Sequence, residues 1–204
     1  MRTHLLVALA TVTLMASTAQ AALFTNGSFE FGPNPGGFTT KNSGNTDITG
    51  WVVTGHSVDY IGSYWQAADG LRSIDLNGNG QGGIEQTFDT IAGTTYRVGF
   101  ALAGNPDGLP LIKTVRTASG VTWQDDTFTL GAATKANMGW QYYTFDFTAA
   151  AASSTLSFSS RDAGFFGAAL DDVSVSAVPE PASLLLLGSG LAAVSVAARR
   201  RARR

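Results

Sequence analysis

The 204-residue sequence predicts an all-β domain, a jelly-roll β-sandwich, from three observations. Short segments alternate apolar and polar residues with the period of two that a half-buried strand requires. Turn-forming residues separate these segments, and 24 glycines supply many of them. Outside the C-terminal segment, no long stretch repeats apolar residues every 3.6 positions. This combination is typical of sandwiches and jelly rolls and not of helical folds.

The expected strands follow one another through residues 22–177, which we take as one domain. They are Leu23–Phe31, Trp51–Thr54, Ser57–Ile61, Arg72–Asn77, Gly83–Phe88, Tyr96–Ala103, Lys113–Ser119, Val121–Leu130, Trp140–Ala149, Thr155–Ser160 and Ala169–Ser176. Polar loops are expected at Gly32–Gly37 and Asn42–Gly50. No repeat of 20–50 residues is present, which argues against a solenoid or a propeller.

Both ends of the chain have the composition of processing segments. A positively charged start, Met1–His4, precedes the apolar run Leu5–Ala16 and an A-x-A pattern that ends at Ala21. This order predicts a secretory signal peptide at residues 1–21.

The C-terminal segment has three parts: Val178-Pro179-Glu180-Pro181, an uncharged apolar run at 182–198, and five arginines within 199–204. The prolines end any preceding strand. A helix over 182–198 would rise about 26 Å, close to the thickness of a bilayer core, and arginines hold such an end on the inner side. The pattern predicts a transmembrane helix with a basic tail, with a buried core helix as the alternative.

This C-terminal arrangement resembles the PEP-CTERM sorting signal of Gram-negative bacteria, through VPEPAS at Val178–Ser183, the short span and the basic end. The resemblance implies that a membrane protease, exosortase, recognises and removes the tail. It also implies a precursor tethered to the inner membrane by the C-terminal helix, and then a protein at the cell surface or in the extracellular matrix.

Charge and composition narrow the function of the domain. Of 15 Asp and Glu residues all but Glu180 lie in residues 22–177, against 7 of the 13 Lys and Arg residues, so the domain has a net charge near −7. Such a surface argues against nucleic acid and suits cations or neutral, hydroxyl-rich ligands. The chain has no cysteine, which excludes disulfides and thiolate metal sites.

No catalytic motif is evident. The only histidine of the domain is His56, and no Gly-x-Ser-x-Gly elbow is present for a serine triad with Ser57. The Gly-rich segment Asn77–Gly83 matches a dinucleotide fingerprint and, from Asp75, the start of an EF-hand loop, but strands flank it. A hairpin is the better interpretation. We expect the protein not to be an enzyme, although paired carboxylates for glycoside hydrolysis cannot be recognised from sequence.

Acids lie near both ends of the domain. Glu30 lies in the first expected strand and Asp171 in the last, and in a sandwich these strands are commonly neighbours. Two carboxylates that meet repel unless a cation separates them, and calcium prefers such oxygen ligands. A structural Ca²⁺ site is therefore one hypothesis; capping of turns and backbone N–H groups by the same acids is the other.

The domain also resembles the galactose-binding-like jelly rolls, which include carbohydrate-binding modules, and more narrowly the bacterial choice-of-anchor C proteins. The matching segments are Asn26–Glu30, Gly50-Trp51, Asp69–Leu76, Gly93–Tyr96 and Leu170–Val173. The resemblance implies a structural calcium bound by Glu30, Asp69 and Asp171, with help from backbone carbonyls such as those of Phe29 and Arg72.

Aromatic residues are the candidates for a glycan site, because sugar rings stack on Tyr and Trp while neighbouring polar groups bind the hydroxyls. Tyr60, Tyr64 and Trp65 form the densest group, and Trp123 lies among polar residues. Core packing is the alternative for each of them.

These observations predict an exported, non-catalytic module that binds extracellular polysaccharide. Two alternatives remain: an adhesive surface protein that binds other proteins through a flat apolar patch, and a glycoside hydrolase with paired carboxylates in a cleft.

Overall fold

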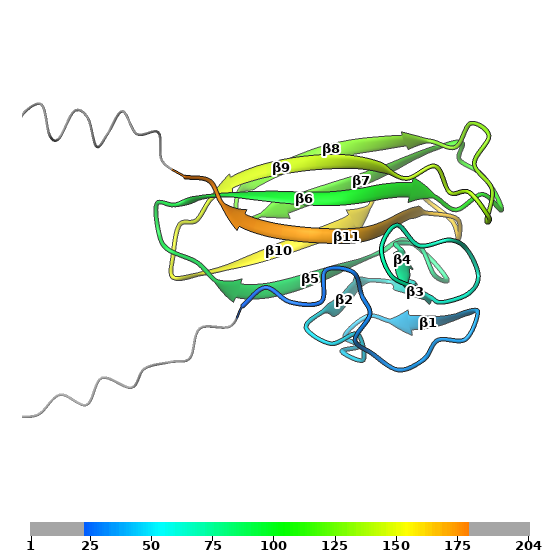
Figure 1. Cartoon of the computed structure of the whole chain (residues 1–204), viewed down its shortest axis with the longest axis horizontal. Helices are drawn as coiled ribbons and strands as arrows, with labels where there is room; N and C mark the ends of the chain where they lie inside the picture. Colours follow the sequence, from blue (N-terminus) through cyan, green and yellow to red (C-terminus); the bar gives the residue numbers. More distant parts are fainter. Residues whose placement is uncertain (1–22, 180–204) are drawn as a thin grey trace, which may run out of the picture.

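The computed structural model describes residues 23–179 (Figure 1). They form eleven strands: β1 (Phe38–Asn42), β2 (Val52–Gly55), β3 (Ser57–Ile61), β4 (Ser73–Asp75), β5 (Gly82–Asp89), β6 (Thr95–Gly104), β7 (Ile112–Ser119), β8 (Thr122–Thr129), β9 (Gln141–Thr148), β10 (Ser153–Ser160) and β11 (Ala168–Ala177). The prediction of an all-β fold is confirmed. No helix within the described range is long and apolar enough to cross a membrane. The expected signal peptide and the helix at 182–198 lie outside the described residues.

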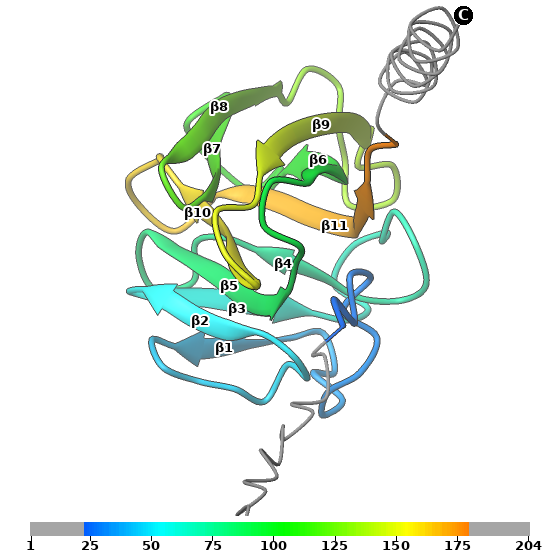
Figure 2. The ribbon, with the colours of Figure 1, turned by 90° about the vertical axis from the view of Figure 1, so that its left-hand side faces the viewer.

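Two antiparallel sheets pack face to face. One has the order β1-β3-β4-β11-β6-β9 and the other β2-β5-β10-β7-β8. Figure 2 shows the two layers side by side, with β1 and β2 at one margin and β8 and β9 at the other. The large core between them buries apolar residues from both sheets, among them Ile74, Ile84, Phe88, Val98 and Phe100.

A second, smaller cluster covers the outer face of the six-stranded sheet. Ile61, Ala103 and Ala169 alternate along their strands with residues of the main core, so they point to the opposite face. Trp65 and Met138, from loops, cover them. Both faces of this part of the sheet are therefore buried, which explains why β6 reads as an almost continuous apolar run near its end.

The first expected strand, Leu23–Phe31, is not a strand. It forms turns because Asn26 and Phe29 adopt positive φ angles of 55° and 59°. Gly27 approaches the last strand so closely that a Cβ atom there would lie 1.7 Å from the carbonyl oxygen of Val173. The edge strand β1 lies between two expected loops and was not predicted.

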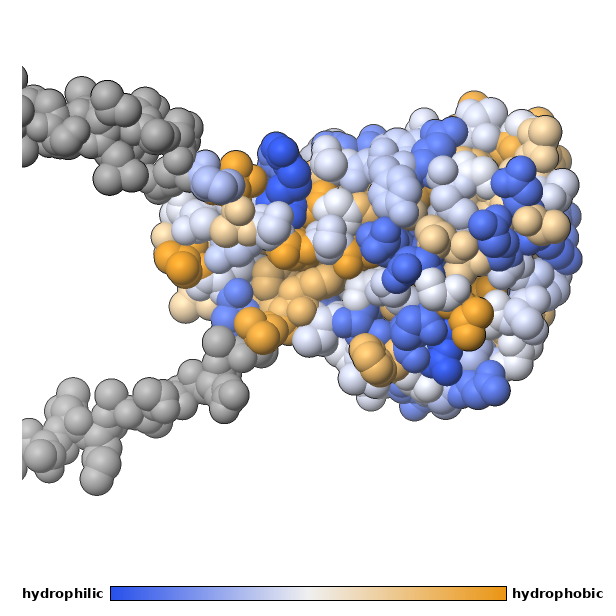
Figure 3. Space-filling model, viewed as in Figure 1, coloured by the Kyte–Doolittle hydropathy of each residue, from blue (hydrophilic) through white to orange (hydrophobic). Residues whose placement is uncertain are grey.

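Both described ends of the domain lie at the same end of the sandwich (Figure 1). The loops that follow β3, β6 and β10 gather at the opposite end. Figure 3 shows hydrophilic residues spread over this opposite end, with single apolar residues among them, whereas a larger apolar area lies toward the termini. We call the end away from the termini the distal end.

Candidate functional site

A hollow of about 210 Å³ opens at the distal end, on the outer face of the six-stranded sheet. We call it the distal pocket. Its walls come from β1, β3 and β4 and from the loops that follow β3, β4, β6 and β10. The side chains with most bearing on ligand binding are those of Phe38, Asp59, Tyr64, Asn79, Asp107 and Phe165.

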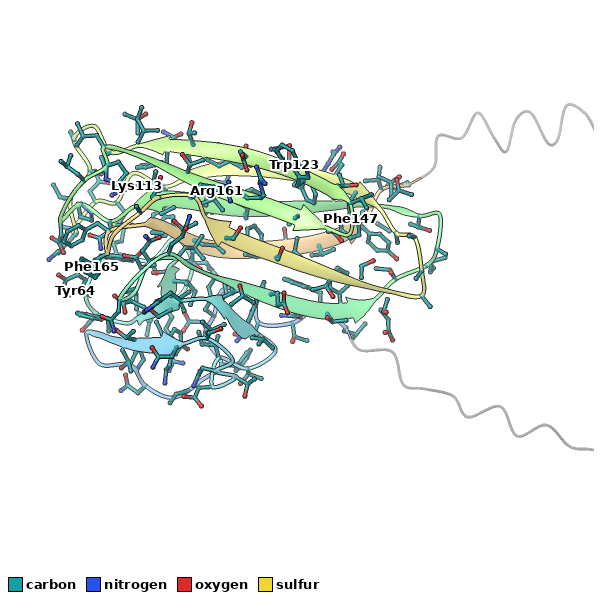
Figure 4. The ribbon with its side chains drawn as sticks, turned by 180° about the vertical axis from the view of Figure 1, so that it is seen from behind. Tyr64, Lys113, Trp123, Phe147, Arg161 and Phe165 are labelled. Carbon is teal, nitrogen blue, oxygen red and sulfur yellow. The ribbon has the colours of Figure 1, made fainter. Side chains whose placement is uncertain are left out.

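Aromatic rings form the rim of the distal pocket. Phe38 is 46% exposed and Phe165 59% exposed, and the ring of Tyr64 meets that of Phe38 edge to face with centroids 5.0 Å apart. Figure 4 shows Tyr64 and Phe165 together at the same end of the domain. Exposed rings at a concave site offer flat apolar surfaces to a ligand.

Polar contacts fix the ring of Tyr64. Its hydroxyl donates to Asp107 Oδ2 at 2.6 Å and accepts from Lys135 Nζ at 2.8 Å. Lys135 also forms an ion pair with Asp107 at 2.9 Å and lies 3.9 Å from the Tyr64 ring centroid. Partial burial acts against ionisation, but the Tyr64 hydrogen bond and the Lys135 ammonium lower the pKa of Asp107. Tyr64 is thus held in one orientation before any ligand arrives.

The floor of the pocket is a polar row across three strands. Thr40 on β1 pairs with Asp59 on β3, which pairs with Asp75 on β4. Thr40 Oγ1 donates to Asp59 Oδ1 at 2.5 Å. Asp75 is fully buried and accepts from the backbone N–H groups of Asn77 and Gly167 and from Asn105 Nδ2. Burial raises the pKa of Asp75 to about 8, and burial also raises the pKa of Asp59.

A buried lysine joins two loops of the distal end. Lys113 Nζ donates to the carbonyl oxygens of Gly108 at 2.9 Å and Phe166 at 2.6 Å. Desolvation lowers the pKa of Lys113. These bonds place the loop that carries Phe165 beside the loop that follows β6, which shapes one wall of the pocket.

Two of the expected ligand-binding aromatics have structural roles. Tyr60 is completely buried: its hydroxyl donates to the Phe29 carbonyl and accepts from Arg72 Nη1, both at 2.6 Å. Its ring is not accessible to a ligand, because alternation on β3 turns it into the main core. Trp65 is 5% exposed and donates from Nε1 to Ser73 Oγ at 2.8 Å. It lies beneath both the distal pocket and a larger, shallower hollow of about 740 Å³.

The fourth expected aromatic, Trp123, lies elsewhere. It is 58% exposed on β8 of the five-stranded sheet, well separated from Tyr64 and Phe165 in Figure 4. The guanidinium of Arg116 lies 4.0 Å from its ring centroid and forms two hydrogen bonds with Asp125, at 2.7 and 2.8 Å. Of the four expected aromatics, the structure brings only Tyr64 and Trp65 to the distal pocket.

Of the three acids expected to bind calcium, Glu30 and Asp171 contact the loop that follows β3, and Asp69 belongs to that loop. Glu30 Oε1 accepts from the backbone N–H groups of Leu71 and Arg72, at 2.7 and 2.8 Å. Asp171, fully buried, accepts through Oδ2 from the N–H groups of Ala68 and Asp69, at 2.7 and 3.0 Å. The exposed Asp69 accepts from Ser28 Oγ at 2.7 Å. Burial raises the pKa of Asp171 to about 7.

This arrangement corresponds to the capping role that the sequence left open. Within residues 23–179 no three His, Cys, Asp or Glu side chains lie together as a ready-made metal-binding group. The donor chemistry is nevertheless that of a hard-oxygen site. The backbone is strained here, since Phe29 and Asp172 have φ angles of 59° and 47°.

His56 and Ser57 do not form a catalytic pair. Their side chains lie 3.1 Å apart, within hydrogen-bond distance. However, Ser57 is completely buried, and its Oγ accepts from the Asn79 N–H at 2.8 Å. A buried hydroxyl in this position is a structural acceptor and is not accessible to a substrate.

Several residues of the distal pocket were not expected from sequence. Phe38 belongs to the unpredicted strand β1, and Asn79 to a segment interpreted only as a glycine-rich hairpin. Asp59 carried a usable signal, an acid between the apolar residues Val58 and Tyr60 of the strand Ser57–Ile61.

The fold and the sequence together define an all-β sandwich domain followed by a sorting motif. The chain belongs to the family described as protein of unknown function (DUF642), which matches residues 22–176. The PEP-CTERM protein-sorting motif matches residues 177–201, so the expected sorting signal is confirmed and indicates export and sorting to the cell surface.

One curated relative and several solved structures are similar to the chain. Halomucin of Haloquadratum walsbyi is 34% identical over 174 residues, which cover 81% of this chain and 2% of that protein. The chain therefore spans only a small part of this relative. TmCBM61 in complex with β-1,4-galactotriose has a TM-score of 0.46 at 14% identity, covering 77% of this chain and 99% of that one. The family 35 carbohydrate-binding module of Paenibacillus barcinonensis has a TM-score of 0.45 at 19% identity, covering 69% and 99%.

Proposed function

We propose that the domain is a non-catalytic carbohydrate-binding domain of an exported protein, and that it binds glycans of the extracellular matrix in the distal pocket. The observation that supports this most directly is the combination in one hollow of exposed aromatic rings with polar side chains. Phe38, Tyr64 and Phe165 offer faces for a sugar ring, and Asp59 and Asn79 offer groups for its hydroxyls.

The position of the pocket supports the same role. It lies at the distal end, away from the segment that leads to the sorting motif (Figure 1). A domain held at its C-terminal end would therefore present the pocket to the surroundings.

The test is a glycan screen with the full-length protein, followed by calorimetry on the glycans that bind. Tyr64→Ala and Phe165→Ala are each expected to weaken binding about fivefold or more, since each stacked ring contributes on the order of 1 kcal/mol or more. Val121→Ala is the matched control, because Val121 is 98% exposed and lies outside the pocket. Unchanged affinity in both ring variants would reject the pocket as the glycan site, and release of reducing ends would favour the hydrolase.

A second candidate, protein adhesion, has one observation in its favour. Leu109, Pro110, Leu111 and Ile112 line a shallow apolar hollow of about 610 Å³ with Ala163. Leu109 and Leu111 are 72% and 61% exposed. If this patch is the functional surface, Leu109→Ser combined with Leu111→Ser would abolish adhesion, whereas Tyr64→Ala in the distal pocket would leave adhesion intact.

We further propose that exosortase processes the tail, that the precursor is tethered to the inner membrane by the expected helix at 182–198, and that the protein ends at the cell surface or in the exopolysaccharide matrix. The motif at 177–201 supports this proposal. Immunoblots should show a shorter product in wild-type cells and only the full-length form in cells without exosortase. Equal sizes in both strains would contradict it.

Structural calcium at Glu30, Asp69 and Asp171 is a separate proposal. A ligand that binds only the folded state raises the melting temperature with concentration. Calcium is expected to raise it in the wild type and to have no effect in Asp171→Asn. No response of the wild type to calcium or EDTA would assign these acids to backbone capping alone.

A further inference from the structure

The carboxylates on the floor of the distal pocket face each other. Asp59 and Asp75 are direct partners in the antiparallel register of β3 and β4, and both line the pocket. Side chains in such a position lie about 5 Å apart at Cβ, and like charges placed there destabilise each other. Repulsion from Asp59 adds to the effect of burial on Asp75.

The basic side chains around the pocket are already engaged. Lys113 donates to two backbone carbonyls, and Lys135 donates to Tyr64 and forms an ion pair with Asp107. Among residues 23–179 the ion pairs leave Asp59 without a cationic partner. Its carboxylate, half-buried at the pocket floor, accepts one hydrogen bond from Thr40.

We propose that the distal pocket selects amino sugars: a hexosamine unit with a free ammonium group directed at Asp59, its ring against the aromatic rim. This inference rests on the proposed carbohydrate-binding function and specifies its ligand. A neutral sugar would remove water from Asp59 and supply no charge in return, whereas an ammonium forms charge-assisted hydrogen bonds with it.

A divalent cation fits the same floor less well. Calcium requires six to eight oxygen ligands. Asp75 already accepts three hydrogen bonds, and the acids among the described residues that line the pocket form no group of three arranged around a metal ion. An ammonium group needs only two or three acceptors, which Asp59 and Asn79 can supply.

The test compares three ligands of equal length on the full-length protein at neutral pH: a glucosamine oligomer, its N-acetylated form and a glucose oligomer. Acetylation removes the charge and keeps the ring. We expect at least about tenfold tighter binding of the free amine, because the charged contact is lost in the other two.

Asp59→Asn keeps an oxygen to accept from Thr40 and removes the charge, so it should lower the affinity for the amine to that for the acetylated oligomer. Asp146→Asn is the control, because it removes the same charge from an exposed ion pair with Arg97. It should leave the preference unchanged.

Each result has a separate meaning. Equal affinity for all three oligomers would overturn the amino-sugar inference and leave the carbohydrate-binding proposal standing. If the folded protein binds none of the three oligomers and no glycan in the screen, both the amino-sugar inference and the carbohydrate-binding proposal are rejected. If Asp59→Asn and Asp146→Asn lower the affinity for the glucosamine oligomer equally, the preference for the free amine comes from general attraction to an acidic surface and not from Asp59. Saturable binding of calcium alone, lost in Asp59→Asn, would make the pocket a cation site instead.

Discussion

Asp171 on the last strand accepts a hydrogen bond from the backbone N–H of Ala68, 103 residues earlier, at 2.7 Å. A second bond, from the N–H of Asp69, ends on the same oxygen. Together they attach the loop that carries Tyr64 and Trp65 to the centre of the six-stranded sheet. The distal pocket thus depends on a carboxylate that does not line it.

Asp171→Ala should therefore destabilise the domain strongly. The substitution leaves three backbone N–H groups, those of Ala68, Asp69 and Asp172, without their acceptor, and each costs on the order of 1–3 kcal/mol. We expect a loss of about 2–5 kcal/mol in chemical denaturation. Asp69→Ala, which removes an exposed acid of the same loop, is the control and should cost less than about 1 kcal/mol. A similar small loss in both would refute the anchoring role.

Stability should fall as the pH rises from about 4 to 8. The folded-state pKa of Asp75 is about 8 and that of Asp171 about 7, both raised by burial from 3.8. The folded protein therefore binds more protons than the unfolded chain in this window, so each group favours folding below pH 4 and loses that effect as the pH rises through its folded pKa. The slope approaches about 1.4 kcal/mol per pH unit for each group.

Urea denaturation at a series of pH values measures this slope. Asp75→Asn should reduce it, and what remains comes from Asp171 and from the other carboxyls whose pKa burial raises, such as Asp59. Asp146→Asn is the control and should leave the slope unchanged, because pairing with Arg97 lowers the pKa of Asp146 away from the window. A wild-type slope of zero would refute the prediction.

Gly27→Ala should disrupt the contact between the N-terminal turn and β11. A Cβ atom at Gly27 would lie 1.7 Å from the Val173 carbonyl oxygen, and a backbone atom cannot move aside cheaply. We expect a loss of about 3 kcal/mol or more. Gly37→Ala is the matched control, since a Cβ atom there meets nothing within 4 Å, and it should change stability by less than about 0.5 kcal/mol.

Trp123→Ala should have little effect on either stability or glycan affinity. The ring contributes a cation–π contact with Arg116 at an exposed position, on the order of 0.5–1 kcal/mol. Calorimetry would compare the glycan affinity of Trp123→Ala, expected to equal that of the wild type, with the lower affinity expected of Tyr64→Ala. A larger loss of affinity in the tryptophan variant would move the glycan site to the outer face of the five-stranded sheet.

Lys113→Met should weaken glycan binding, although Lys113 does not line the distal pocket. Its ammonium holds the carbonyl oxygens of Gly108 and Phe166, and methionine would leave both without this donor. We expect a destabilisation of about 1–3 kcal/mol and an affinity below that of the wild type. Unaltered affinity would show that Phe165 is placed by other contacts.

The sequence was sufficient to predict the strands whose neighbours bury one face. The predicted strands Tyr96–Ala103 and Thr155–Ser160 lie within β6 and β10. They could be predicted because every second residue of such a strand points into the core and is apolar. Leu23–Phe31 alternates as well, yet the positive φ angles of Asn26 and Phe29 make it a turn, and alternation contains no information about φ.

The site was harder to predict than the fold. Tyr64 and Trp65 both line the distal pocket, although Trp65 is buried, whereas Tyr60 belongs to the core, since neighbours on a strand face opposite ways. The pairing of Asp59 with Asp75, 16 residues later, depends on the register of β3 and β4, which no local pattern reveals. Phe38 and Phe165 come to the rim only through long-range packing.

The two described ends of the sandwich emerge from the same end, opposite the distal pocket (Figure 1). A domain built this way projects to one side of the polypeptide, because the chain enters and leaves it at the same end. A pulling force applied through the chain would act at the end of the domain that carries both termini, where the Val178 N–H donates to the Thr95 carbonyl oxygen. It would not act directly on the distal pocket. The same geometry lets such a domain be inserted into a much longer protein without changing what it presents outward.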